Sequence, residues 1–274
     1  MPVAALSTAN IHYESDGPDT GRPVVFVHGY AMGASLWAPL SRRLSGEGLR
    51  CLTPTWPLGA HPEPLRPGAP SDLAGVAATV AAFLEDLDLH DVVLVGNDTG
   101  GLVAQLVAVH HPERLGALVL TSCDAFENFP PPVLRPFILA SRTRATFRAA
   151  VTPLRLEVVR RRAFGPLAHA DIDALTSQWV RPALRDPAVA EDLRRLTASL
   201  DRQTSVDVGR RLGEVTLPTL VAWSADDVFF PVEDAHRLQA AIPHAKLEVI
   251  DGARTFSMID QPDRLAGLVA ATAT

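Results

Sequence analysis

The chain has 274 residues, of which 47% are hydrophobic and 20% are charged, and its formal net charge is −6 at pH 7. This length and composition are typical of a soluble globular protein with one α/β domain and an insertion. The two cysteines are too few for a disulfide framework, the first ten residues lack a signal peptide, and no apolar run could span a bilayer, so we expect a cytoplasmic protein without a membrane partner.

The charge is unevenly distributed along the chain. Residues 135–211 contain 15 Arg against 8 Asp and Glu, a local excess of +7 that leaves −13 for the remainder. Such a basic segment can favour an anionic substrate, but arginines on solvated helix faces are the simpler and preferred explanation. The arginines are not interleaved with aromatic residues and no nucleic-acid-binding motif is present, so we expect no nucleic-acid partner.

The first half of the chain alternates short apolar runs with helical patterns. In chain order we predict a weak strand at 11–13, a buried parallel strand at 24–27, a helix at 37–44, a short strand at 51–52, a helix at 71–88, a strand at 92–95 and a helix at 100–109. A loop rich in proline and glycine, residues 54–70, follows the strand at 51–52 and leads into the helix at 71–88.

The second half begins with a strand and then changes character. Further strands are predicted at 115–120, 219–223 and 247–250, and further helices at 232–241 and 262–271. Alternating strands and helices imply a mostly parallel sheet with helices on both faces. Because residues 126–212 show only helical patterns, we expect a core of residues 1–125 and 213–274 and an inserted helical cap of residues 126–212.

The sharpest motif follows the 92–95 strand and reads Gly96-Asn97-Asp98-Thr99-Gly100-Gly101. A strand that turns sharply into a helix around Asp98 would hold its side chain above the sheet, and only glycine leaves room on either side. The following helix N-terminus favours negative charge. A nucleotide-binding glycine turn is the alternative, but the G-x-G-x-x-G spacing is absent.

A second motif, Phe26-Val27-His28-Gly29-Tyr30, ends the predicted central strand. Together, and in this order, the two motifs resemble the α/β-hydrolase superfamily, and most closely its branch with aspartate nucleophiles, the haloalkane and fluoroacetate dehalogenases and epoxide hydrolases. The resemblance covers nearly the whole chain. It implies an α/β-hydrolase fold, Asp98 as nucleophile, and an oxyanion hole made by the backbone N–H groups of Tyr30 and Thr99.

The resemblance also implies a supporting acid after the 219–223 strand and a histidine after the last strand. Asp227 matches the acid position best, with Asp226 as its neighbour, and a turn acid that caps the next helix is the alternative. Where the family has Gly-His, this chain has Arg254-Thr255. Arginine stays protonated and threonine cannot take a proton near neutral pH unaided, so the usual water-activating base is missing.

Several neighbouring residues complete the predicted site. The residues expected to border the substrate pocket are His28, Gly29, Asn97, His61, Asp124 and Thr255. His61 lies in the loop at 54–70 and either serves the site or is simply exposed to solvent. Asp124 either lines the pocket or caps the first cap helix.

Specific activities of the branch lose support from the sequence. Haloalkane dehalogenases have a halide-binding tryptophan directly after the nucleophile, and this chain has Thr99 there. Epoxide hydrolases use tyrosines of the cap, but the two tyrosines of this chain, Tyr13 and Tyr30, lie outside the predicted cap. We therefore expect a hydrolase of a small organic molecule that uses Asp98 as nucleophile or general base, needs no cofactor and holds no metal. A lyase, isomerase or cyclase on this fold, and a catalytically silent ligand-binding protein, remain alternatives.

Overall fold

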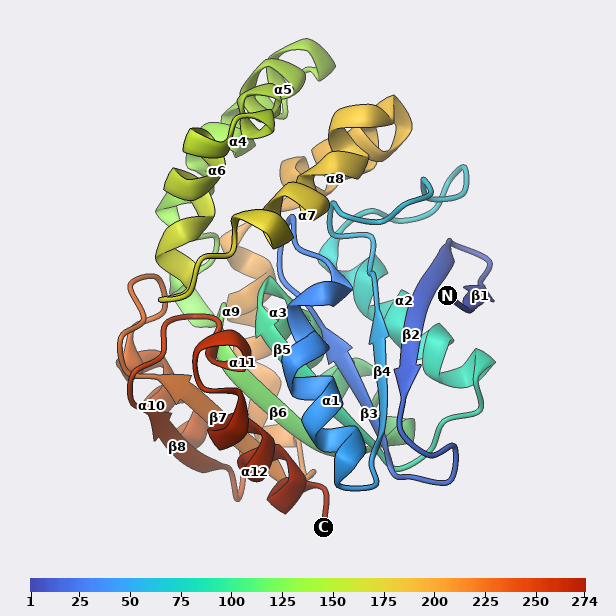
Figure 1. The fold of residues 1–274 in the computed structure, drawn as a ribbon, viewed down its shortest axis with the longest axis vertical. Coiled ribbons are helices and arrows are strands. Elements are labelled where there is room, and N and C mark those ends of the chain that lie inside the picture. The colour runs from blue at the N-terminus through green and yellow to red at the C-terminus, as the bar shows by residue number, and fades with distance from the viewer.

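The computed structural model describes residues 1–274 as a mixed sheet of eight strands surrounded by helices (Figure 1). The strands are β1 (Val3–Ala5), β2 (Asn10–Asp16), β3 (Pro23–Val27), β4 (Arg50–Pro54), β5 (Val92–Asp98), β6 (Leu115–Cys123), β7 (Thr219–Ser224) and β8 (Lys246–Ile250). Their order in the sheet is β1-β2-β4-β3-β5-β6-β7-β8, and all neighbours from β4 to β8 run parallel. The predicted α/β-hydrolase architecture, with a mostly parallel sheet, is confirmed.

The central strands form because they are continuous apolar runs. Nearly every residue of β3, β5, β6 and β7 is buried, as expected for parallel strands covered on both faces. The predicted strands all occur, each extended by one to three residues at one or both ends. β1 was not predicted, because three residues give too short a pattern, and it pairs antiparallel with β2 at the sheet edge.

Helices cover the two faces of the sheet and create two separate hydrophobic clusters. One cluster lies under α2 (Leu73–Asp86), α3 (Thr99–His110) and α10 (Val232–Ala241), and the other under α1 (Ala38–Gly46) and α12 (Pro262–Thr272). Both cysteines are free and buried in these clusters. None of the twelve α-helices combines the length and the apolar character that crossing a bilayer would require.

The segment between β6 and β7 contains no strand. Its helices are α4 (Arg135–Ala140), α5 (Arg144–Val151), α6 (Glu157–Phe164), α7 (Asp173–Arg185), α8 (Pro187–Ser199) and α9 (Arg202–Arg211), with 3-10 turns between them, among which are η5 (Thr152–Arg155) and η6 (Gly165–Leu167). α4 to α8 stand beyond the carboxyl ends of the strands, at the top of Figure 1, and α9 runs back alongside α3. Parallel α/β sheets bind ligands at this edge.

Candidate active site

Asp98 lies at the last position of β5, immediately before α3, in a strained backbone conformation. Its φ of 55° and ψ of −135° are unusual for a residue with a side chain, and such strain is characteristic of functional sites. Glycine is required beside it, because a Cβ on Gly100 would lie 2.2 Å from the Val27 carbonyl oxygen, and one on Gly96 2.6 Å from the Gly100 carbonyl oxygen. The tight packing of β5, α3 and β3 therefore forces the turn that presents Asp98.

The Asp98 carboxylate is held by two backbone N–H groups. Its Oδ1 accepts hydrogen bonds from the Thr99 N–H at 2.6 Å and the Tyr30 N–H at 3.1 Å. Glycine at position 29 permits this approach, since a Cβ there would lie 2.1 Å from the same oxygen. The two amides expected to form an oxyanion hole thus converge on one oxygen of Asp98 itself.

Burial and neighbouring carboxylates perturb the acidity of this site. Burial, aided by the charge of Asp227, raises the pKa of Asp98 to about 6 against the opposing effect of the two backbone N–H groups. Thr99 Oγ1 donates a hydrogen bond to Asp124 Oδ2 at 2.8 Å. Burial, followed by the charge of Asp98, raises the pKa of Asp124 well above its usual range. We therefore expect Asp124 to be protonated and Asp98 to be largely ionised at neutral pH.

Asp98 opens onto a cavity of about 120 Å³ between the sheet and the helical insertion. Apart from Tyr30, Asp98 and Thr99, all of its lining residues are apolar. The apolar walls are made chiefly by Phe137, Leu154, Phe164, Leu193, Phe229 and Phe230. No sequence pattern indicates these wall residues, because apolar side chains in amphipathic helices do not show which of them face a cavity and which face the core.

Asp227 lies on the turn after β7 and contacts Thr255. Its Oδ1 accepts hydrogen bonds from the Phe229 N–H (2.8 Å), the Phe230 N–H (3.0 Å) and Thr255 Oγ1 (3.0 Å). Its Oδ2 is buried without a hydrogen-bond partner, and burial raises its pKa. Asp226, by contrast, is exposed and pairs with His169 at 3.0 Å. The structure thus brings Asp227, and not Asp226, into contact with Thr255.

Thr255 is fully buried and is held in place through its main chain as well as its hydroxyl. The Asn97 side-chain amide donates to the carbonyl oxygens of Thr255 (2.9 Å), Thr121 (2.9 Å) and Ser122 (3.2 Å). Asn97 therefore ties the end of β6 to the segment after β8. The Arg254 guanidinium instead donates to the Ala168 carbonyl oxygen at 3.3 Å, so it faces the helical insertion.

Neither predicted pocket histidine reaches Asp98. His28 accepts from the Trp56 N–H at 2.9 Å, its Nδ1 lies 3.1 Å from the Gly29 carbonyl oxygen, and burial lowers its pKa to about 4, so it is a neutral residue that braces the turn. His61 is 2% exposed, so the alternative of a solvent-exposed loop histidine is wrong. Its Nε2 lies 3.5 Å from Asp192 Oδ2 on α8, because the 54–70 loop packs against that helix.

The predicted residues therefore divide into two groups. Asp98, Tyr30 and Thr99 line the cavity. The residues behind this wall are Asp227, His28, Gly29, Asn97, His61, Asp124 and Thr255, of which Gly29 and Asp124 contact Asp98 or Thr99 directly. The structure brings no three His, Cys, Asp or Glu side chains together as a metal site.

Comparisons with known proteins agree with the fold. The model of the alpha/beta hydrolase family matches residues 24–268. A 2-hydroxy-6-oxononadienedioate/2-hydroxy-6-oxononatrienedioate hydrolase of Cupriavidus pinatubonensis is 30% identical over 243 residues, which cover 85% of this chain and 81% of that protein. Among solved structures, a thermophilic esterase from Thermogutta terrifontis has a TM-score of 0.76 at 23% identity, covering 97% of this chain and 94% of the esterase. An enol-lactonase from Burkholderia xenovorans has a TM-score of 0.73 at 19% identity, covering 99% of both chains.

Proposed function

This chain belongs to the alpha/beta hydrolase family, and from that membership we propose that it is a hydrolase of a small organic molecule in which Asp98 is the nucleophile. One observation carries the proposal. Asp98 Oδ1 is fixed by the N–H groups of Tyr30 and Thr99, at the edge of an otherwise apolar cavity. Oδ2 is then the oxygen available for attack.

The geometry suits attack on a saturated carbon. Oδ2 donates its electron pair to that carbon, the bond to the leaving group breaks, and the leaving group departs with the bonding electrons. Oδ1 becomes the carbonyl oxygen of the resulting ester and keeps both backbone N–H donors. These donors then stabilise the oxyanion when water attacks the ester carbon. On this proposal the chain belongs with the aspartate-nucleophile branch of the family.

The second half of such a cycle needs a base, and Asp227 with Thr255 stands where the family has acid and histidine. We propose Asp227 as the supporting acid, since it lies 3.0 Å from the Thr255 hydroxyl. Without an imidazole, release of the ester should be slow. Accumulation of a covalent intermediate is therefore the expected signature of this enzyme.

A general-base role for Asp98 is the second candidate, and its perturbed acidity favours it. A carboxylate with a pKa raised to about 6 is a better base at neutral pH than an ordinary aspartate. Proton transfer from a carbon acid would need no covalent ester and no histidine. A lyase, isomerase or cyclase reaction would follow from this role.

The cavity and the helical insertion limit the substrate. We propose that residues 126–212 act as a cap over a core of residues 1–125 and 213–274, since cap residues such as Phe137 and Phe164 supply much of the apolar wall. A cavity of about 120 Å³ fits a small, largely apolar group next to Asp98. A dioate, such as the one in the name of the Cupriavidus hydrolase, would fit next to Asp98 only with its carboxylates outside this apolar space.

Intact-protein mass spectrometry tests the proposal. The protein is exposed to panels of haloalkanes, haloacids, epoxides and esters, and the wild type should gain the mass of the transferred group, mapped to Asp98 by peptide analysis. Asp98→Asn should gain none. Solvent-deuterium incorporation into a carbon acid without an adduct would identify the general-base role instead. Normal turnover by Asp98→Asn would overturn both roles, and ligand-dependent thermal stabilisation without turnover would indicate a silent binding protein.

A further inference from the structure

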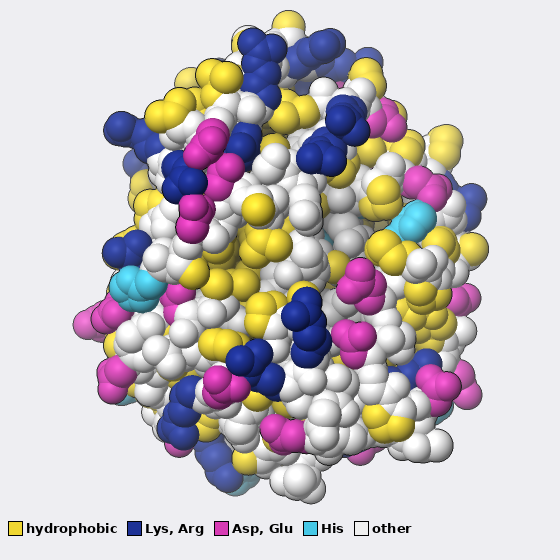
Figure 2. Space-filling view, viewed as in Figure 1, with side chains coloured by type: hydrophobic (Ala, Val, Ile, Leu, Met, Phe, Trp, Pro, Cys, Tyr) yellow, Lys and Arg dark blue, Asp and Glu magenta, His cyan; other side chains and the backbone are white.

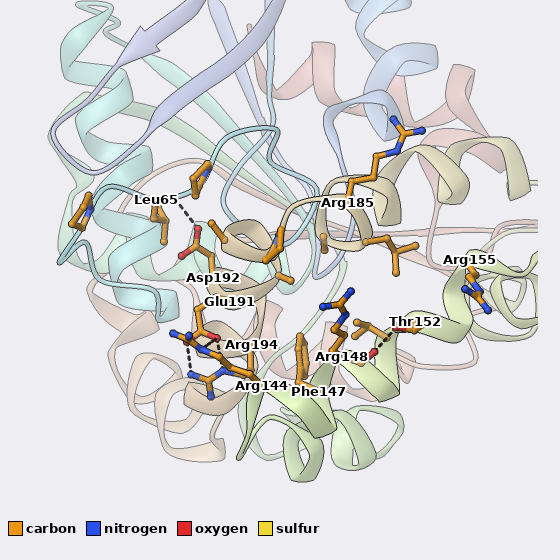
Figure 3. Close-up of a pocket in the computed structure, with 18 residues that line it drawn as sticks. Leu65, Arg144, Phe147, Arg148, Thr152, Arg155, Arg185, Glu191, Asp192 and Arg194 are labelled. Carbon is orange, nitrogen blue, oxygen red and sulfur yellow. Dashed lines mark hydrogen bonds and ion pairs between the residues drawn. The ribbon is translucent and has the colours of Figure 1, made fainter.

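A second and much larger cleft, of about 860 Å³, lies in the helical insertion and is not lined by Asp98. Figure 3 shows its lining residues. Its walls come from α5, η5, the junction of α7 and α8, and the loop around Leu65. Arg148 stands near the middle of the cleft in Figure 3, with Arg155 and Arg185 toward one end and the Arg144–Glu191–Arg194 group at the other. In the space-filling view, basic side chains gather over the upper part of the molecule, where these helices lie (Figure 2).

The positive charge in this cleft exceeds what its own acids neutralise. Five arginines line it, together with only two acids. Glu191 is already paired with Arg194 at 2.7 Å and with Arg144 at 3.0 Å. Arg148, Arg155 and Arg185 form no ion pair with any acid of the protein.

The second acid, Asp192, is also occupied. Its Oδ2 accepts the Leu65 N–H at 2.7 Å and lies 3.5 Å from His61 Nε2. It therefore serves to fasten the 54–70 loop to α8 and is not free to neutralise an arginine. The three unpaired guanidinium groups leave a net positive cleft.

The floor of the cleft is apolar and comes from the same helix as two of the arginines. Phe147 and Val151 are buried and lie four residues apart on α5, next to a row formed by Arg144 and Arg148, also four residues apart. Like charges at this spacing destabilise a helix, so the row is unfavourable for folding alone. Val151 also lines the Asp98 cavity, so the two spaces adjoin there.

We propose that this cleft binds an organic carboxylate with an apolar body, the carboxylate at Arg148, with the positive charge of Arg155 adding to the attraction, and the apolar part over Phe147 and Val151. Guanidinium groups match the planar geometry of a carboxylate and bind it through two parallel hydrogen bonds. An apolar floor beside them selects an amphiphilic anion over a fully hydrated one. The site is separate from Asp98 and does not depend on the proposed reaction.

Isothermal titration with azelate, a linear dicarboxylate, tests the site at low ionic strength. Wild-type protein should bind azelate, and the affinity should fall as salt is added, because the arginines are exposed. The double variant Arg148→Gln/Arg155→Gln should bind at least about tenfold more weakly, since it removes the charge-assisted hydrogen bond to Arg148 and the attraction of Arg155. Dimethyl azelate, which lacks the charges, should not bind.

Two control variants make the outcome decisive. Arg142→Gln/Arg162→Gln removes the same charge from exposed arginines of the insertion outside the cleft and should leave azelate binding unchanged. Asp98→Asn should also bind azelate normally, whatever its activity. The proposal is overturned if azelate does not bind, or if both double variants lose the same amount of azelate affinity. It is also overturned if inorganic phosphate binds as tightly as azelate, or if Asp98→Asn abolishes azelate binding while Arg148→Gln/Arg155→Gln does not.

Discussion

Replacing Asp98 by asparagine should stabilise the folded protein at neutral pH while it removes catalysis. The carboxylate is buried at the cavity edge, and burial raises its pKa from the ordinary value of 3.8 to about 6. Asparagine has the same shape, and its side-chain oxygen can accept the same N–H groups of Tyr30 and Thr99. It carries no charge that the fold must desolvate.

The expected size and direction follow from proton linkage. Below pH 3.8 the carboxyl group is protonated in both the folded and the unfolded state, so it contributes no pH dependence. As the pH rises toward 6, the unfolded state releases the proton first, and the free energy of unfolding therefore falls. Above pH 6 the whole penalty is present, and a pKa difference of about 2.2 corresponds to on the order of 3 kcal/mol.

Urea denaturation of wild type and Asp98→Asn between pH 4 and pH 8 measures this difference. The two proteins should be about equally stable near pH 4, and the variant should gain a growing advantage up to about pH 7. Asp251→Asn, the same change at an exposed residue without an ion pair, serves as the control and should show no such trend. A stability difference that does not change with pH, or a variant that is less stable at pH 8, would refute the assigned burial of charge at Asp98.

The remaining predictions concern activity. Thr255→His should speed the release of an Asp98 ester by about 10²–10⁴-fold, the usual contribution of a general base. The Thr255 hydroxyl already lies 3.0 Å from the Asp227 carboxylate, which can orient an imidazole at this position. An adduct of unchanged lifetime in single-turnover mass spectrometry would contradict this. Gly29→Ala should lower activity at least about 10²-fold, because the new Cβ would lie 2.1 Å from Asp98 Oδ1 and push this oxygen away from its N–H donors. An unimpaired rate would show that those donors take no part in the reaction. Wild-type activity should rise with pH through a midpoint near 6, since Asp98 acts in its ionised form. Asp227→Asn removes a charge that raises the pKa of Asp98 and should move this midpoint to lower pH. Asp124→Asn removes a group that is already protonated and should leave the midpoint in place.

Much of the fold was predictable because its signals are local. The strands at the centre of the sheet are continuous apolar runs, and the turn at Asp98 is specified by glycines at 96, 100 and 101 that a larger residue could not replace. The strand-free segment between β6 and β7 was visible for the same reason, as a long stretch with only helical periodicity. β1 was missed because pairing with β2 creates it, and three residues carry no periodic pattern of their own.

The site was predictable only where a motif fixes the main chain. Asp98, Tyr30 and Thr99 follow from two turns whose backbone geometry depends on glycine. The partnership of His61 with Asp192 joins residues 131 positions apart, and no sequence pattern relates them. The link from Thr99 to Asp124 likewise depends on the register of β6 beside β5, in which Asp98 pairs with Cys123. The arginine-lined cleft was anticipated only as a local excess of charge, because the sequence does not show which arginines lack an acid nearby.

The two backbone N–H groups at Asp98 also discriminate among reactions open to this family. An incoming carbonyl oxygen would need the same Tyr30 and Thr99 donors, and so would first have to displace Asp98 Oδ1 from bonds that contribute about 1.5–3 kcal/mol each. Alkyl transfer to Oδ2 and proton abstraction by Oδ2 leave those bonds in place throughout. We therefore expect substrates that react at a saturated carbon or a C–H bond to be turned over, or trapped, more readily than simple esters.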